Sequence, residues 1–263
     1  HQRKAFTESQ KMKLSLLLCL LLTSVLPAEQ LRINPKGFLM EEWELRNLCK
    51  PTLEIFPKAK DPPLFISHHQ DGPITLFQRT PKGEVAIQLN CKDRYYAQFI
   101  YQFAHELGHV RANFKPVDHE NKWLEEALCE TASLFALRQL SIHWKENAPN
   151  KALKNYRKSL ASYADTVMKA REPLTLETAP AFYQEHRTTL REHATRRNLN
   201  GAFANLILPL LEAEPDHWHT LAHIPRKKGA TLAEHFDAWR KGTPQKHHRF
   251  LAKMEALFLG KPD

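Results

Sequence analysis

The apolar residues of this chain follow two different periods, and the change between them separates a region of short strands from a longer helical region. Residues 64–90 contain three short apolar or alternating runs, which are separated by the turn sequences DGP and PKG. Alternation over a few residues between turn signals predicts strands, and consecutive strands joined in this way favour a small antiparallel meander. Residues 29–62 predict one short helix, over residues 40–50, which ends at Pro51.

From Arg94 onward the apolar spacing is helical almost throughout. The expected breaks lie near Pro116, Pro149, Pro173, Gly201, Pro215, Gly229 and Gly242. Thr231 and Glu234 have the spacing of a capping box, which predicts the start of a late helix. The sequence therefore predicts an α+β fold in which a small antiparallel sheet is followed by many helices.

The first strong helix, expected over residues 95–112, carries two histidines in the sequence FAHELGHVRA. Its apolar residues recur at increments of three and four and form one stripe. At about 100° per residue, His105 and His109 lie nearly opposite that stripe, so they are not expected to be ordinary core histidines. Two interpretations stay open: a solvated helix face, or a pair of metal ligands, because residues four apart on a helix point the same way.

The next helical pattern, over residues 122–140, reads KWLEEALCETASLFALRQL. Glu126 and Glu130 are four residues apart and share a face, whereas Glu125 is rotated away by about 100°. One carboxylate of the shared face could complete a metal site, and the other could orient a ligand histidine. The alternative is a charged helix surface, since most glutamates are exposed.

HELGH followed by WLEEALCE resembles the gluzincins, the zinc metallopeptidases that include thermolysin and the neutral aminopeptidases. The resemblance covers residues 105–130 and implies a zincin-like fold, with an active-site helix, a glutamate helix and a helical C-terminal part. It implies that His105, His109 and Glu126 bind Zn²⁺ and that Glu106 is the general base for a zinc-activated water. Glu130 matches the acidic residue that supports the first histidine.

The chain departs from the gluzincin pattern in two places, and other zinc families fit it less well. Glu126 follows the second histidine by 17 positions, fewer than in the best-known members, and Ala127 stands where glycine is usual. A metzincin would have glycine and histidine where this chain has Ala112 and Lys115. An aspartate-ligated site could use Asp118, but that residue lies in a segment without helical periodicity.

Two further parts of a gluzincin site have candidates in the sequence. The alternating run at residues 84–90 resembles the edge strand along which these peptidases bind extended substrate, although an ordinary sheet strand has the same pattern. The residue that stabilises the oxyanion comes from the C-terminal helical part in gluzincins. The candidates are Tyr163, Tyr183, His186 and His193, and the sequence does not choose between them.

The N-terminal segment has the features of a secretory signal peptide beginning near Met12. Basic Lys11 and Lys13 precede an apolar run from Leu14 to Leu26, and Pro27-Ala28 follows. This pattern predicts a secreted or periplasmic protein with no stable membrane span after cleavage. The net charge of +9 falls to +6 when residues 1–28, which contribute +3, are left out. That balance does not indicate nucleic-acid binding.

Three cysteines remain beyond this segment. In an oxidising compartment Cys49 and Cys91 could form a disulfide, whereas Cys129 lies in a helical pattern and is expected to be a buried thiol. The histidine-containing tracts SHHQ, DHWHTLAH and QKHHRF lack partners at ligand spacing and are expected at the surface.

These patterns together predict three parts: a signal segment (residues 1–28), a zincin-like catalytic part (29–150) and a helical subdomain (151–263). The expected protein is an exported zinc metallopeptidase that acts on a peptide or protein substrate. Two alternatives are a non-catalytic protein that keeps the zinc site for structure or peptide binding, and a basic module for anionic surfaces. Oligomeric state is not indicated.

Overall fold

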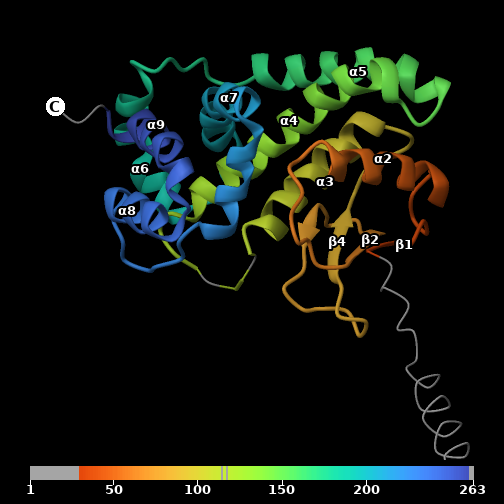
Figure 1. Ribbon diagram of the computed structural model, residues 1–263, viewed down its shortest axis with the longest axis horizontal. Helices are drawn as coiled ribbons and strands as arrows, with labels where there is room; N and C mark the ends of the chain where they lie inside the picture. The colour runs from red at the N-terminus through yellow and green to blue at the C-terminus, as the bar shows by residue number, and fades with distance from the viewer. Residues whose placement is uncertain (1–29, 114, 117, 261–263) are drawn as a thin grey trace, which may run out of the picture. The chain divides into compact units, whose positions relative to one another are not determined.

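The N-terminal part of the chain contains a four-stranded mixed sheet, which Figure 1 shows beside helices α2 and α3. The strands are β1 (Leu31–Ile33), β2 (Leu64–His68), β3 (Ile74–Thr75) and β4 (Val85–Leu89). Their spatial order is β1-β2-β4-β3. β1 pairs in parallel with β2, and β2 with β4, whereas β3 is antiparallel to β4 and forms one edge.

The expected antiparallel meander is therefore wrong, although the α+β class with a small sheet is confirmed. Helix α2 (Glu42–Glu54) connects β1 to β2, and a helical crossover is what a parallel pair requires. The chain passes from β2 to β3 and then returns to form β4 between them. The run at residues 84–90, which the sequence left open between an edge strand and an ordinary sheet strand, therefore contains an inner strand. Helix α2 also continues through Pro51, where the sequence predicted its end.

Helices α3 (Tyr96–Arg111) and α4 (Lys122–Asn147) occur where the sequence predicted them. Both are buried almost all round, because α3 packs against β4, α2 and α4, and α4 against α3, α5 and α7. Two of the largest fully buried side chains, Trp123 and Trp144, come from α4. The pattern on α3 is therefore that of a core helix, and its histidine face is covered by a neighbour.

The rest of the chain is helical. The elements are α5 (Lys151–Lys169), α6 (Ala179–Glu192), α7 (Arg197–Ala213), η1 (Pro215–His223), α8 (Leu232–Gly242), η2 (Gln245–His247) and α9 (His248–Leu259). Long α4 begins beside α6, α8 and α9 and runs toward the side of this unit that contains the sheet, where α5 follows (Figure 1). The capping box of Thr231 and Glu234 is confirmed at the start of α8. Gly201 does not break a helix but lies inside α7.

The computed structural model describes residues 30–113, 115–116 and 118–260. The expected signal segment and Cys19 lie outside these ranges. The described residues from Leu31 onward form one compact unit. At the boundary that the sequence predicted between residues 29–150 and 151–263, the side chain of Asn150 caps the start of α5. Within the described ranges no helix is long and apolar enough to cross a membrane.

Cys49 and Cys91 do not form the disulfide that the sequence left open. Both are buried free thiols, as is Cys129. Burial raises the pKa of Cys91 to about 11 and raises that of Cys49 further above its usual value, so these thiols stay protonated at neutral pH.

Candidate metal centre

The packing of α3 on α4 brings His105, His109 and Glu126 together. Oε2 of Glu126 lies 3.5 Å from Nε2 of His105 and 3.7 Å from Nε2 of His109. The side chains of His105 and Glu126 are each 11% exposed. A solvated histidine face, the alternative that the sequence left open, is therefore excluded.

A cysteine also belongs to this group. His105, His109 and Cys129 have ligand atoms within 4.8 Å of one another, and no other group of this kind occurs in the part of the chain that the structure describes. This group could hold a metal ion. The sequence did not predict Cys129 here, because it placed this thiol in the core.

The two candidates for a third ligand differ in where they lie. Glu126 faces a cavity together with both histidines, whereas Cys129 is fully buried and does not line that cavity. Burial raises the pKa of the Cys129 thiol to about 12, so it keeps its proton at neutral pH in the absence of a metal. Burial of Glu126 acts in the same direction, but hydrogen bonding to the two histidines outweighs it and lowers its pKa well below the usual value.

The separations at this centre would let one metal ion contact all three side chains, and they can be compared with those around zinc. Ligands at 2.0–2.1 Å around a tetrahedral zinc lie about 3.3–3.4 Å from one another. The distances from Oε2 of Glu126 to the two Nε2 atoms, 3.5 and 3.7 Å, are close to this value. Metal-binding histidines usually direct their other ring nitrogen to a carboxylate, and both histidines do so here, His105 to Glu130 and His109 to Glu125.

Glu130 lies beside His105, as the sequence predicted. Its Oε1 is 3.7 Å from Nδ1 of His105. Its Oε2 accepts hydrogen bonds from Nη2 of Arg171, at 2.5 Å, and from the hydroxyl group of Tyr101. The carboxylate is nearly buried, so the arginine and the tyrosine supply the positive charge and the hydrogen bonds that stabilise it.

Glu125 supports the second histidine, a contact that the sequence did not predict. Its Oε1 lies 2.8 Å from Nδ1 of His109, and because a carboxylate only accepts, Nδ1 carries the proton. Arg226 forms an ion pair with Oε2 of Glu125 at 2.9 Å. Burial acts to lower the pKa of His109, but Cys129, Glu125 and Glu126 outweigh it and hold that pKa well above the usual value.

Glu106 lines the same cavity as the two histidines, and a residue of the sheet holds its carboxylate in place. Its Oε2 accepts a hydrogen bond of 2.7 Å from Oγ1 of Thr75 on edge strand β3. The side chain is almost fully buried, yet it lines the cavity beside His105 and His109. A carboxylate fixed beside the histidines in this way is placed to exchange a proton with a bound water.

The cavity above the centre has a volume of about 360 Å³. Its lining includes the segment from Pro73 to Phe77, which contains β3, and residues from the start of α7. The complete lining is Pro73, Ile74, Thr75, Leu76, Phe77, His105, Glu106, His109, Lys122, Glu126, Glu130, Thr195, Arg197 and Asn200. The centre is thus open to a ligand that lies along the sheet edge.

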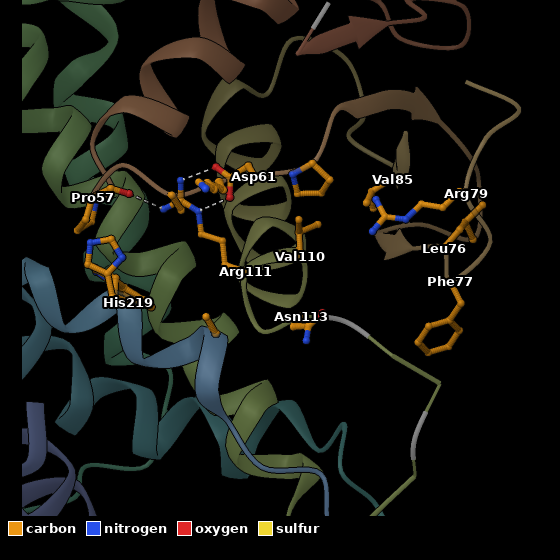
Figure 2. A pocket seen from close by; sticks show the side chains of 15 residues that line it. Pro57, Asp61, Leu76, Phe77, Arg79, Val85, Val110, Arg111, Asn113 and His219 are labelled. Atoms are coloured by element: carbon orange, nitrogen blue, oxygen red, sulfur yellow. Dashed lines mark hydrogen bonds and ion pairs between the residues drawn. The ribbon is translucent and has the colours of Figure 1, made fainter. Parts of the chain in front are cut away.

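A larger cavity of about 490 Å³ shares Leu76 and Phe77 with this one (Figure 2). Figure 2 shows Arg111 between Asp61 and Pro57, and its Nη2 lies 2.8 Å from Oδ2 of Asp61. It contains no cluster of metal-ligand side chains, so we regard it as a continuation of the site cavity beyond Phe77 and not as the centre itself.

The four candidates for an oxyanion-stabilising residue occupy different places. Tyr163 alone among them lines a cavity that also contains His105. Tyr183 is buried against Trp123, His186 packs on Phe182, and His193 follows the last turn of α6. The structure therefore brings one of the four near the centre.

The histidine tracts are not all at the surface as expected. His217 and His247 are buried, and their Nδ1 atoms lie 2.9 Å apart. His69 and His223 are exposed. The expectation was wrong for the buried pair because η1 and η2 fold these two rings into the helical core.

Gly108 allows α3 to approach α4 closely at the centre. A β-carbon there would lie 2.8 Å from Sγ of Cys129 and 3.2 Å from its Cα. Gly108→Ala should therefore lower the free energy of unfolding by about 1–3 kcal/mol, measured by urea denaturation. Because Sγ is the nearest atom, adding Cys129→Ala should restore part of the loss. A single variant as stable as the wild type would show that the helices separate without cost.

Arg171 should stabilise the fold through Glu130. Arg171→Met leaves a nearly buried carboxylate without its cation and should cost about 3–5 kcal/mol in urea denaturation. The matched control is Arg138→Met, because Arg138 pairs with Glu212 but its side chain is 40% exposed. That control should cost about 1 kcal/mol or less. Equal losses in the two variants would contradict the special role of the Arg171–Glu130 pair.

No family model matches this chain, and no curated protein and no solved structure was found to be similar to it.

Proposed function

We propose that this protein is an exported zinc-dependent metallopeptidase of gluzincin type. The observation that carries the proposal is the position of Glu106, which lines a cavity along a sheet edge together with the two histidines and the carboxylate of Glu126. The export signal rests on the N-terminal sequence pattern alone.

Each residue of the centre has a role in this proposal. His105, His109 and Glu126 hold zinc, while Glu130 and Glu125 fix the orientation of the two histidines. When bound, zinc acidifies water and polarises a substrate carbonyl. Glu106 takes the proton from the attacking water and passes it to the leaving amine, and Thr75 holds its carboxylate in position.

Strand β3 provides the surface for the substrate backbone. One side of β3 pairs with β4, and its residues also line the site cavity. Backbone groups on the outer side of an edge strand can pair with an extended peptide. Ile74 and Phe77, which are 44% and 50% exposed, lie where substrate side chains would pass.

A non-catalytic zinc protein is the second candidate. It would need the same ligands and the same sheet edge. Glu106 favours catalysis, because the three proposed ligands are complete without it and a structural centre has no use for a base at the cavity wall.

The decisive experiment is a digest of a mixed peptide library by the purified, zinc-loaded protein, analysed by mass spectrometry. The proposal expects about one zinc per chain and cleavage products that disappear with a chelator. A chain that binds zinc but cleaves no peptide would support the non-catalytic candidate. A chain that remains metal-free after incubation with zinc would overturn both.

A further inference from the structure

A third, small cavity adjoins the site cavity at Pro73, whereas the larger cavity adjoins it at Leu76 and Phe77. Its volume is about 90 Å³, against about 360 Å³ for the site cavity and 490 Å³ for the cavity beyond Phe77. It shares Pro73, His105 and Arg197 with the site cavity. The three cavities thus form a series, in which the cavity that contains the centre adjoins a larger one at Phe77 and a much smaller one at Pro73.

The narrow cavity is rich in hydrogen-bond donors. Arg197 of α7 supplies a guanidinium group, and among the described residues its side chain forms no ion pair or hydrogen bond. Tyr163 of α5 supplies a hydroxyl group, whose pKa is raised by burial, so it keeps its proton at neutral pH. The amide oxygen of Gln98 accepts a hydrogen bond from the backbone N–H of Lys92. The NH₂ group of Gln98 is therefore left to donate to another partner.

Acceptors in this cavity are either absent or already engaged. No aspartate or glutamate is among its lining residues. The side chain of Gln102 exchanges hydrogen bonds with Asn90 through both its oxygen and its nitrogen. The hydroxyl of Tyr101 donates to Glu130 and accepts from Arg171. A group that enters the cavity therefore meets these donors and the exposed guanidinium group of Arg197, which together suit an anion.

We propose that this narrow cavity is a carboxylate subsite, in which Arg197 and Tyr163 bind the negatively charged end of a substrate. This inference rests on the proposed peptidase function and adds a substrate class to it. The narrow end leaves little room for chain beyond the centre, whereas the cavity beyond Phe77 accommodates more. The carboxylate is either the C-terminus of the peptide or an acidic side chain close to the cleaved bond, and the first source makes the enzyme a carboxypeptidase.

The test compares three versions of one short peptide: with a free C-terminus, with an amidated C-terminus, and amidated with aspartate as the last residue. Hydrolysis of the free acid alone assigns the chain terminus, and hydrolysis of the aspartate peptide as well assigns carboxylates in general. Equal kcat/KM values for the neutral amide and both acids would overturn the subsite.

Arg197→Gln should raise KM for the preferred acid by about 10- to 100-fold, the worth of hydrogen bonds to a charged group, and leave the amide unchanged. Arg196→Gln is the matched control, because Arg196 is an exposed neighbour that does not line the cavity. An equal effect of the two variants on the acid would show that only the general positive charge matters, and would contradict the proposal.

Tyr163→Phe separates substrate recognition from a role at the reacting carbonyl. As part of the subsite, Tyr163 should affect KM for the acid and not kcat for the amide. A fall in kcat for all three peptides would instead place its hydroxyl at the oxyanion and remove it from the subsite.

Binding measurements keep this inference distinct from the proposed function. Calorimetric titration of the zinc-loaded Glu106→Gln protein with the acid and the amide measures recognition without hydrolysis. Tighter binding of the acid that is lost with Arg197→Gln supports the subsite even if the wild type cleaves no peptide. Equal binding of acid and amide overturns it, whatever the activity.

Discussion

Replacing Glu106 with glutamine should leave zinc bound and reduce kcat for peptide hydrolysis by about 10²–10⁴-fold, the usual contribution of a general base. Glutamine has almost the same shape, and its amide oxygen can still accept the hydrogen bond from Thr75. It cannot take a proton from water. The loss should therefore fall on kcat, with little change in the free energy of unfolding.

The measurement is a steady-state assay on the best peptide from the library digest, together with zinc content by atomic spectrometry. Glu54→Gln is the control, because Glu54 is an exposed glutamate at the end of α2, away from the cavity. Wild-type activity in Glu106→Gln would remove Glu106 from its role as the base. Loss of zinc together with activity would mean that Glu106 contributes to metal binding instead.

Local spacing was sufficient to predict the two helices and which of their polar side chains share a face, whereas the meeting of the two faces was implied by the resemblance to the gluzincins. The interval of four residues fixes the common direction of His105 and His109, and a second helix with Glu126 and Glu130 at the same interval can present two carboxylates to them. The common direction of the side chains on each helix depends on helical geometry alone. This is why the sequence-based expectations for these four side chains agree with their positions in the structure.

The sheet was predicted less well because strand order depends on contacts between distant segments. Turn signals mark where strands end but do not determine which strands become neighbours. The parallel pairing of β1 with β2 depends on the α2 crossover, and the edge position of β3 on pairing with β4. Residues 84–90 were consequently left open between an edge strand and an ordinary sheet strand, and Thr75 on edge strand β3 was not recognised as the residue that contacts Glu106.

The charged partners of the centre could not be predicted from local patterns. Arg171 reaches Glu130 across 41 positions, and Arg226 reaches Glu125 from beyond η1. Gly201, which was expected to break a helix, lies where a β-carbon would meet the side chain of Arg171 at 2.5 Å. Glu125 was set aside because it is rotated from Glu126 by about 100°, yet that rotation directs it to the far nitrogen of His109.

Glu126→Ala should weaken zinc binding far more than Glu125→Ala, because the first change removes a ligand and the second removes only the partner of one. Loss of a partner such as Glu125 typically costs about 10–100-fold in metal affinity. Glu126→Ala should exceed that range. Competition with a chromophoric chelator measures both affinities, and thermal unfolding with and without zinc shows whether each variant is folded.

Cys129→Ser decides between the two possible third ligands. If Glu126 is the ligand, Cys129→Ser should retain zinc affinity within about tenfold of the wild type, because the thiol lies away from the cavity and its loss leaves three ligands in place. If the sulfur is the ligand, the order is reversed and Glu126→Ala keeps the metal. The carboxylate should prevail, because it faces the cavity with its proton already lost, whereas zinc would have to displace a proton from a fully buried thiol.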